Sequence, residues 1–258
     1  MNWTPEFLEL VRGYQDEAGW YPRTYAELDA KVIAVDWLVA HREWIVSHGW
    51  GMGDRAHWWI WKLLCEQMPS PFKFLEIGVY RGSILSLMAL IGQKIGKETL
   101  IYGVTPLKAT SDANYTYPET NTPGGWAVDV KTSFDVLAPG CEQPTLMIGY
   151  SSEPNIIEMA RGFAPYDILY IDGGHDYHQV VEDIQHYCPM VRSGGLLIMD
   201  DASCLINVPR TGEAGGWTGY ESVSTAVRDA LDSNPEWSHL FAVSHNRVYY
   251  HGPRSDFV

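Results

Sequence analysis

Beyond residue 70, short apolar runs alternate along the chain with stretches whose apolar residues recur at helical spacing. Short apolar runs are typical of buried strands, and the longer pattern is typical of amphipathic helices. Their alternation predicts an α/β fold with a mostly parallel sheet flanked by helices. The expected strands cover residues 72–78, 99–104, 145–149, 166–172 and 195–200, and the expected helices cover 83–91, 128–137, 155–161, 177–188 and 220–231.

Two features interrupt this alternation. The last apolar runs, 240–244 and 247–251, are separated by a short polar turn, which predicts an antiparallel C-terminal hairpin. Residues 106–126 are rich in Thr, Asn, Pro and Gly and show no apolar period, so they indicate a long loop. Loops of this length in compact domains are often functional.

The first quarter of the chain holds eight of the eleven tryptophans. Its helical periodicity is interrupted at Gly13, Gly19, Pro22 and the glycine-rich run 49–53, which predicts two or three short helices and a flexible joint. Either this segment is a helical layer packed on the core, or it is a lid whose aromatic side chains shape a pocket. The chain is therefore divided into a helical, Trp-rich segment, 1–65, and the main α/β domain, 66–258.

The charge and composition of the chain limit the kinds of molecule that it is expected to bind. The 258 residues include 32 acidic side chains against 18 Lys and Arg, a formal net charge of −14, and no basic run reverses this locally. A nucleic acid or an anionic membrane is therefore not expected as a partner, and a small molecule is. The chain also lacks a membrane-spanning run and a signal-peptide layout, so a cytoplasmic location is expected. Its four scattered cysteines show no metal-site spacing and are expected to be buried thiols.

Ligands of open α/β sheets bind at the carboxyl ends of the strands. The first expected strand is followed by a turn with a glycine at the strand exit and another at the helix start, a pattern that suits a tight turn and close packing. A dinucleotide fingerprint needs a central glycine where this turn has Tyr80, so NAD and FAD are disfavoured. The turn reads Glu76-Ile77-Gly78-Val79-Tyr80-Arg81-Gly82-Ser83.

Acidic residues end two further strands. Asp172 follows the fourth strand and opens an Asp-Gly-Gly-His run that includes His175, and Asp200 and Asp201 end the fifth strand. If these strands are neighbours, three carboxylates meet at one rim, which is costly unless a cation neutralises them. Oxygen ligands select a hard ion, Mg²⁺ first and then Mn²⁺ or Ca²⁺.

A competing interpretation is that these aspartates cap the following helices and face water. Adjacent strand residues also point to opposite faces, so one member of the Asp200-Asp201 pair is a candidate for an indirect role.

The E-x-G-x-x-x-G turn resembles the first motif of the class I S-adenosylmethionine-dependent methyltransferases. The D-G-G-H run with its downstream D-D resembles the branch of that family that methylates sugar or phenolic hydroxyls with a bound divalent metal. That branch includes the O-methyltransferases of macrolide and aminocoumarin biosynthesis and, more distantly, a cephalosporin-pathway protein associated with hydroxylation. The resemblance covers residues 72–251 and implies a Rossmann-like fold that a terminal hairpin closes.

The resemblance also implies roles for individual residues. Asp172, Asp200 and Asp201 correspond to the metal ligands, and His175 corresponds to the base. The cofactor S-adenosylmethionine would contact Glu76, Gly78, Tyr80, Gly82 and Ser83 at its methionine end and Ser151 and Ser152 at its adenosine end.

The second strand departs from the family pattern. Many relatives carry an acidic residue after it to hold both ribose hydroxyls, and this chain has Thr105. A hydroxyl makes one such bond but lacks the charge-assisted pair of a carboxylate. Asp112 or Glu119 from the long loop could substitute, or the ribose could be held differently, or the cofactor site could be repurposed.

The expected function is S-adenosylmethionine-dependent, divalent-metal-assisted O-methylation of a small sugar, polyol or phenol in natural-product biosynthesis, with self-association as in many relatives. One alternative is a hydroxylase-type or other non-methylating metal enzyme on the same fold. Another is a non-catalytic binding protein whose Trp-rich segment is its interface.

Overall fold

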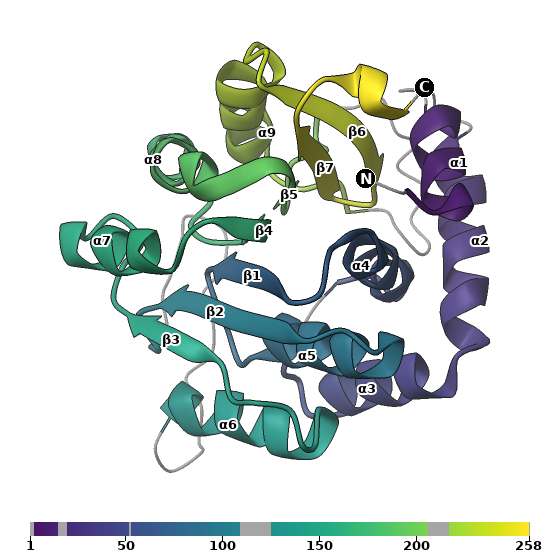
Figure 1. Cartoon of the computed structure of the whole chain (residues 1–258), viewed down its shortest axis with the longest axis vertical. Helices are drawn as coiled ribbons and strands as arrows, with labels where there is room; N and C mark the ends of the chain where they lie inside the picture. The colour runs from purple at the N-terminus through teal and green to yellow at the C-terminus, as the bar shows by residue number, and fades with distance from the viewer. Residues whose placement is uncertain (1–2, 15–19, 52, 109–124, 206–216, 258) are drawn as a thin grey trace.

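The computed structural model describes residues 3–14, 20–51, 53–108, 125–205 and 217–257. Its centre is a seven-stranded sheet of order β3-β2-β1-β4-β5-β7-β6 (Figure 1). The first five strands of the chain pair in parallel, and β7 pairs antiparallel with both β5 and β6, which confirms the predicted fold class. The strands are β1 Phe72–Ile77, β2 Thr99–Thr105, β3 Thr145–Ile148, β4 Tyr166–Ile171, β5 Val191–Met199, β6 Trp237–Val243 and β7 Asn246–His251.

Helices cover both faces of the sheet, so the central strands are buried on both sides and their sequences are nearly continuous apolar runs. Along β4, Ile168 and Tyr170 belong to one hydrophobic cluster, whereas Leu169 and Ile171 belong to the other. The first cluster includes α4 Ala56–Gln67, α5 Ser83–Ile95 and α6 Gly125–Leu137. The second includes α7 Pro154–Phe163, α8 Tyr177–Tyr187 and α9 Glu221–Val227, which continues as a π-helix over Arg228–Asp232.

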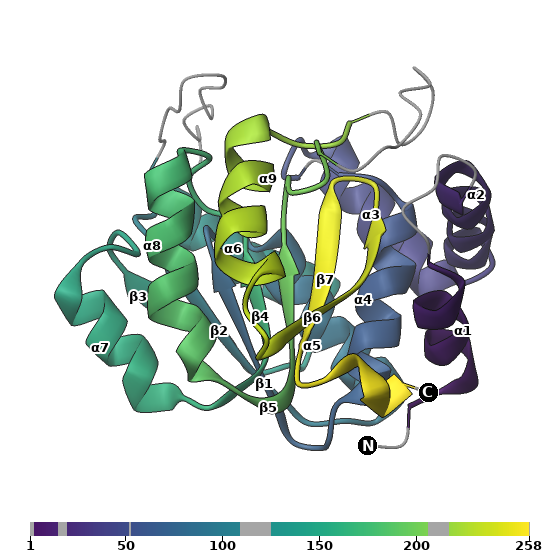
Figure 2. The ribbon, with the colours of Figure 1, turned by 90° about the horizontal axis from the view of Figure 1, so that it is seen from above.

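The N-terminal segment forms more helices than the sequence predicts. Its described residues form four, α1 Pro5–Gly13, α2 Trp20–Ile33, α3 Asp36–Ser47 and α4, of which α1 and α2 lie beyond α4, on the side of the molecule away from α7 and α8 (Figure 2). The last of them, α4, is apolar on most of its surface, and its Trp58 and Trp61 are buried in the core. The expected boundary between residues 65 and 66 falls inside α4.

Two short backbone contacts align the strand ends. The Asp172 N–H donates to the Ile77 carbonyl at 2.8 Å, and the Asp200 N–H donates to the Ile171 carbonyl at 3.0 Å. The parallel pairing thus extends one residue beyond β1, β4 and β5. Both aspartates therefore leave the sheet at the same level and at its carboxyl edge.

The C-terminal hairpin brings a second element to this edge. Because β7 runs antiparallel to β5, with Met199 opposite Arg247, the turn at Ser244 and His245 lies beside the end of β5. The Ala202 N–H donates to the His245 carbonyl at 2.8 Å, which fixes the turn against the chain that leaves β5.

Among the described helices, none has the length and apolarity that crossing a membrane requires.

Gly78 is the residue on which the alignment of β1 with β4 depends. Its φ is +101°, and a Cβ there would lie 1.9 Å from the Asp172 carbonyl oxygen. Gly78→Ala is therefore expected to lower the free energy of unfolding by more than about 4 kcal/mol, or to prevent folding, because backbone atoms would have to separate. Chemical denaturation measures the loss.

Gly96→Ala is the matched control. Gly96 also has a positive φ, +72°, but a Cβ there meets nothing within 4 Å. Only the conformational cost of about 1 kcal/mol is expected. Equal losses for the two variants would show that the contact with Asp172 does not constrain the fold.

Candidate active site

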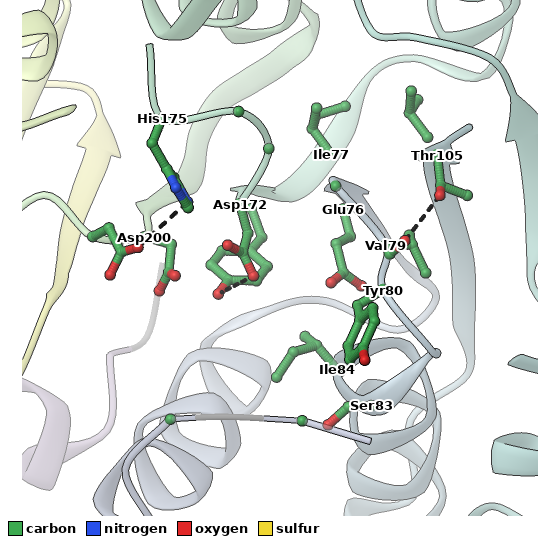
Figure 3. Close-up of a pocket in the computed structure, with 18 of the residues that line it drawn as sticks. Glu76, Ile77, Val79, Tyr80, Ser83, Ile84, Thr105, Asp172, His175 and Asp200 are labelled. Carbon is green, nitrogen blue, oxygen red and sulfur yellow. Dashed lines mark hydrogen bonds and ion pairs between the residues drawn. The ribbon is translucent and has the colours of Figure 1, made fainter. Parts of the chain in front are cut away.

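A cavity of about 1060 Å³ opens at the carboxyl edge of the sheet. It is lined by the glycine turn after β1, by the ends of β4 and β5, and by α4 with the segment before it (Figure 3). The predicted pocket-shaping role of the Trp-rich segment and its packing role thus coexist in one helix, because α4 is both a core layer and a cavity wall.

Most of the residues expected at the cofactor line this cavity. They are Glu76, Gly78, Tyr80, Ser83, Thr105 and Ser151. Among the described residues, Gly82 and Ser152 are not part of the lining. Gly82 instead packs on α6, where a Cβ would lie 2.6 Å from the Ser133 Oγ, and the Ser152 side chain is exposed.

The Thr105 hydroxyl is engaged by the backbone. It donates to the Val79 carbonyl at 2.9 Å and accepts from the Leu107 N–H at 3.0 Å. Thr105 thus stabilises the two loops that follow β1 and β2, and its one proton is not free for a ribose oxygen. Asp112 and Glu119, the suggested substitutes, lie outside the described residues.

The carboxylates of Asp172 and Asp200 lie beside each other, as the sequence predicts. Asp172 is hydrogen-bonded to Asp200 and accepts from the Tyr170 hydroxyl at 3.0 Å. Burial, followed by the charges of Asp200 and Asp201, raises the pKa of Asp172 well above its usual value. In the absence of a cation Asp172 is therefore the protonated partner of the pair.

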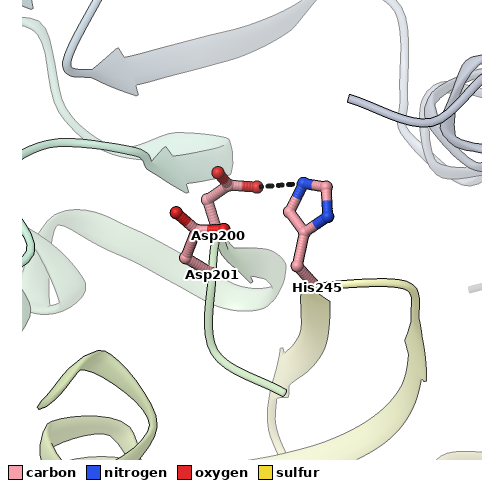
Figure 4. A group of neighbouring side chains, drawn as sticks. All are labelled: Asp200, Asp201 and His245. Carbon is pink, nitrogen blue, oxygen red and sulfur yellow. Dashed lines mark ion pairs between the residues drawn. The ribbon is translucent and has the colours of Figure 1, made fainter. Parts of the chain in front are cut away.

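Asp200 is ionised because of His245. Burial alone would raise the pKa of Asp200, but the imidazolium of His245, whose Nε2 lies 3.3 Å from Oδ1, holds that pKa below its usual range (Figure 4). Burial acts in the opposite direction on His245, and the charge of Asp200 prevails and raises the His245 pKa to about 9.

Asp201 and His175 form the other half of the cluster. His175 Nε2 lies 3.4 Å from Asp201 Oδ2, and Trp217 Nε1 donates to Asp201 Oδ1 at 2.7 Å. Burial and the charge of Asp200 raise the pKa of Asp201 to about 6. The His175 ring stacks on Tyr220 with centroids 4.3 Å apart, and the Ser222 hydroxyl donates to the His175 carbonyl at 2.6 Å.

Asp200, Asp201 and His245 each offer one ligand atom, and these atoms lie within 4.8 Å of one another (Figure 4). This group differs from the expected set in that His245 takes the place of Asp172. Two carboxylates and an imidazole on a buried edge suit a divalent cation, so the residues fit the metal that the resemblance implies.

The sequence analysis did not assign a role to His245, Trp217 or Asn246, all of which line the cavity. For His245 a signal existed: an antiparallel hairpin beside the last parallel strand must place its turn at the carboxyl edge. No such signal marks Trp217, because it follows a stretch without periodicity.

Comparison with known families agrees with this geometry. Residues 75–202 match the profile of a family described as a methyltransferase domain. This part of the chain is therefore a methyltransferase domain. Among curated proteins, no sequence matches this chain.

Solved structures share its fold. CalS11, described as a TDP-rhamnose 3′-O-methyltransferase of calicheamicin biosynthesis, has a TM-score of 0.54 and 15% identity over 93% of this chain and 97% of its own. An O-methyltransferase from Bacillus cereus in complex with SAH has a TM-score of 0.54 and 12% identity over 87% and 97%. The O-methyltransferase NovP has a TM-score of 0.50 and 17% identity over 77% and 80%. At these identities the likeness concerns the fold.

Glu76 is the clearest electrostatic marker of the site. Burial, and then the charge of Asp200, raise its pKa to about 8, and its Oε2 is buried without a hydrogen-bond partner. The folded state therefore binds one more proton than the unfolded state between the ordinary pKa of Glu and about pH 8. Stability from this group is present at low pH and is lost as the pH rises through that range.

Glu76→Gln removes this dependence. In metal-free protein, the variant is expected to gain stability relative to wild type by about 1 kcal/mol for each pH unit between pH 6 and 8. Urea unfolding at several pH values measures the difference. Glu9→Gln, at an exposed position of α1, is the control, and a difference that does not change with pH would contradict the assignment.

Proposed function

We propose that this methyltransferase transfers the methyl group of S-adenosylmethionine to a hydroxyl of a small molecule, assisted by a divalent cation at its carboxylate cluster. The observation that carries the proposal is that the glycine turn after β1 and the group Asp200, Asp201 and His175 line one cavity. A cofactor on the turn and a hydroxyl at the cluster would therefore share one enclosed space.

At the end of the cavity proposed for the cofactor, a ligand can approach the protein backbone closely. Gly78 leaves the wall without a side chain, and Glu76, Tyr80 and Ser83 surround it, so these residues are proposed to hold the methionine end. Ser151 is proposed to face the adenosine, and its Oγ accepts from Gln179 Nε2 at 3.2 Å. S-adenosylmethionine supplies an electrophilic methyl group when it is bound there.

His175 is proposed as the base. As the new C–O bond forms and the C–S bond of the sulfonium breaks, the hydroxyl proton would pass to the imidazole. Asp201, 3.4 Å from Nε2, stabilises the resulting imidazolium, and the stacked Tyr220 fixes the plane of the ring.

Asp200 and Asp201 are proposed to hold the cation, with Asp172 or His245 as the third ligand. A divalent cation beside the acceptor lowers the pKa of a hydroxyl, which near neutral pH is otherwise a poor nucleophile. Both candidates for the third position carry a proton in the metal-free protein, so ligation by either one releases a proton. Cation binding should therefore weaken as the pH falls.

Thr105 favours a second candidate, a metal-dependent enzyme that does not methylate. Its hydroxyl is engaged by the Val79 and Leu107 backbone, and no carboxylate stands at that position to hold a ribose. Calorimetric titration with SAH separates the two candidates. Saturable binding supports methyl transfer, whereas metal binding without any affinity for SAH supports the alternative.

His175→Ala is expected to lower kcat by about 10²–10⁴-fold and to leave the Kd for SAH unchanged, because the proposed base contacts the acceptor and not the cofactor. Transfer of labelled methyl from S-adenosylmethionine measures kcat, with an acceptor identified among the small molecules that co-purify with the protein. His186→Ala on α8 is the control. A variant at His175 with full activity would remove it from the mechanism.

Removal of the cation is expected to abolish turnover. Excess EDTA should reduce methyl transfer to background, Mg²⁺ or Mn²⁺ should restore it, and Asp200→Asn should reproduce the chelated state because it removes the ionised carboxylate of the cluster. SAH titration of Asp200→Asn verifies that the cofactor site is intact. Activity that persists in EDTA would exclude the metal from the mechanism.

A further inference from the structure

A buried carboxylate on α8 lies beneath the loops that follow β3 and β4. Asp183 is only 1% exposed. Gln179 Nε2 donates to its Oδ1 at 3.1 Å, and the Ser151 hydroxyl bonds to the same carboxylate. A Cβ on Gly173 would lie 3.3 Å from Oδ2, so the carboxylate also packs against the loop after β4. A carboxylate is costly to bury, and this one is bonded to two residues of the cavity lining.

Asp183 is ionised near neutral pH. Burial, the largest effect, raises its pKa to about 6, and the neighbouring Glu182 acts in the same direction. The bonds from Ser151 and Gln179 oppose this rise. Above about pH 6 the carboxylate can therefore only accept hydrogen bonds.

The charge of Asp183 determines which end of the Gln179 amide faces it. The atom 3.1 Å from Oδ1 must be the NH₂ group, because an ionised carboxylate cannot donate. The same nitrogen lies 3.2 Å from Ser151 Oγ, so both amide hydrogens have an acceptor. The carbonyl oxygen Oε1 is at the opposite end of the amide, and none of the described residues donates to it. It retains accessible surface in a residue that lines the cavity.

An accessible carbonyl oxygen is complementary to a ligand that brings a hydrogen-bond donor. Gln179 and Ser151 lie together at the end of the cavity proposed for the adenosine. The adenine ring carries an amino group at its 6-position, which donates, whereas hypoxanthine has a carbonyl there, which accepts. A fixed amide with its carbonyl toward the ligand would therefore discriminate between purines that differ at this position.

We infer that Gln179 recognises the amino group of the adenine ring, and that Asp183 is the positioning residue that holds the Gln179 amide in the orientation this requires. The inference rests on the proposed function for its cofactor and names a specificity-determining pair at that site. Ser151 accepts the second amide hydrogen and so supports the same orientation.

The experiment compares two nucleosides by calorimetric titration of the full chain with excess Mg²⁺ at pH 8, where Asp183 is ionised. One is SAH, and the other is S-inosylhomocysteine, in which a carbonyl replaces the 6-amino group. The inosyl compound is expected to bind wild type at least about tenfold more weakly, because it places an acceptor against Gln179 Oε1. Equal Kd values for the two nucleosides would overturn the inference.

Gln179→Met tests the recognition step. It keeps the length of the side chain and removes the carbonyl, so the ratio of the two Kd values is expected to fall below about threefold. Gln185→Met, at an exposed position of the same helix, is the matched control and should keep the wild-type ratio. A wild-type ratio in Gln179→Met would show that another group recognises the base.

Asp183→Asn tests the positioning step. The neutral amide of Asn can donate to Gln179 Oε1, so the Gln179 amide is free to turn its NH₂ group toward the ligand, and the ratio is again expected to fall below about threefold. Glu182→Gln, at the exposed neighbouring position, is the control. Thermal unfolding verifies that both variants are folded.

A merely structural role for Asp183 gives a different result. Asp183→Asn would then weaken the binding of both nucleosides equally and leave their ratio unchanged, which would overturn the inference. Failure of the proposed function is also distinguishable, since wild type would then bind neither SAH nor the inosyl compound.

Discussion

The site depends on the extension of parallel pairing one residue past the ends of β1, β4 and β5. The hydrogen bonds from Asp172 to Ile77 and from Asp200 to Ile171 continue the ladder after the strands have ended. They place the carboxylates of Asp172 and Asp200 side by side at the ends of two adjacent strands. In a buried environment, two carboxylates this close to each other cannot both remain ionised. Gly78 makes this arrangement possible because it leaves room for the Asp172 carbonyl.

The surrounding residues compensate for that electrostatic conflict. Asp172 keeps a proton and bonds to Asp200, and Asp200 keeps its charge beside the protonated His245. Asp201 is stabilised from two sides by Trp217 and His175. Without a cation, protonated Asp172 and His245 therefore lie on either side of the ionised Asp200. A cation that bound to Asp172 or His245 would displace the proton of that residue.

The sequence predicted the parts of this arrangement that follow from periodicity. The sheet, its flanking helices and the terminal hairpin were expected within a few residues, because each has a clear apolar period. Asp172, Asp200 and His175 were expected at one edge because parallel strands end together. Gly82 and Ser152 were expected at the cofactor but do not line the cavity, since a motif gives the order of residues and not the direction of each side chain. Gly82 is used for packing on α6.

The contacts that could not be predicted are those made across long sequence separations. His57 is 186 residues from Val243, and their hydrogen bond joins α4 to the hairpin. His57 Nδ1 also lies 3.2 Å from the side-chain amide of Asn246, so the same helix contacts both strands of the hairpin. The local sequence pattern of α4 or of the hairpin does not predict that these two elements contact each other.

The position of α4 connects the core of the fold to the cavity. A helix that only covered the sheet would need apolar residues on one face, but α4 is buried around most of its circumference and borders the cavity as well as the core. Trp58 and Trp61 therefore contribute both to the core of the domain and to the lining of the cavity. The hairpin turn borders the same cavity through His245 and Asn246, and it contacts α4 through the hydrogen bond between His57 and Val243. Because these two elements come from opposite ends of the chain, this part of the cavity forms only when both have packed on the sheet, whereas the glycine turn after β1 is a local structure.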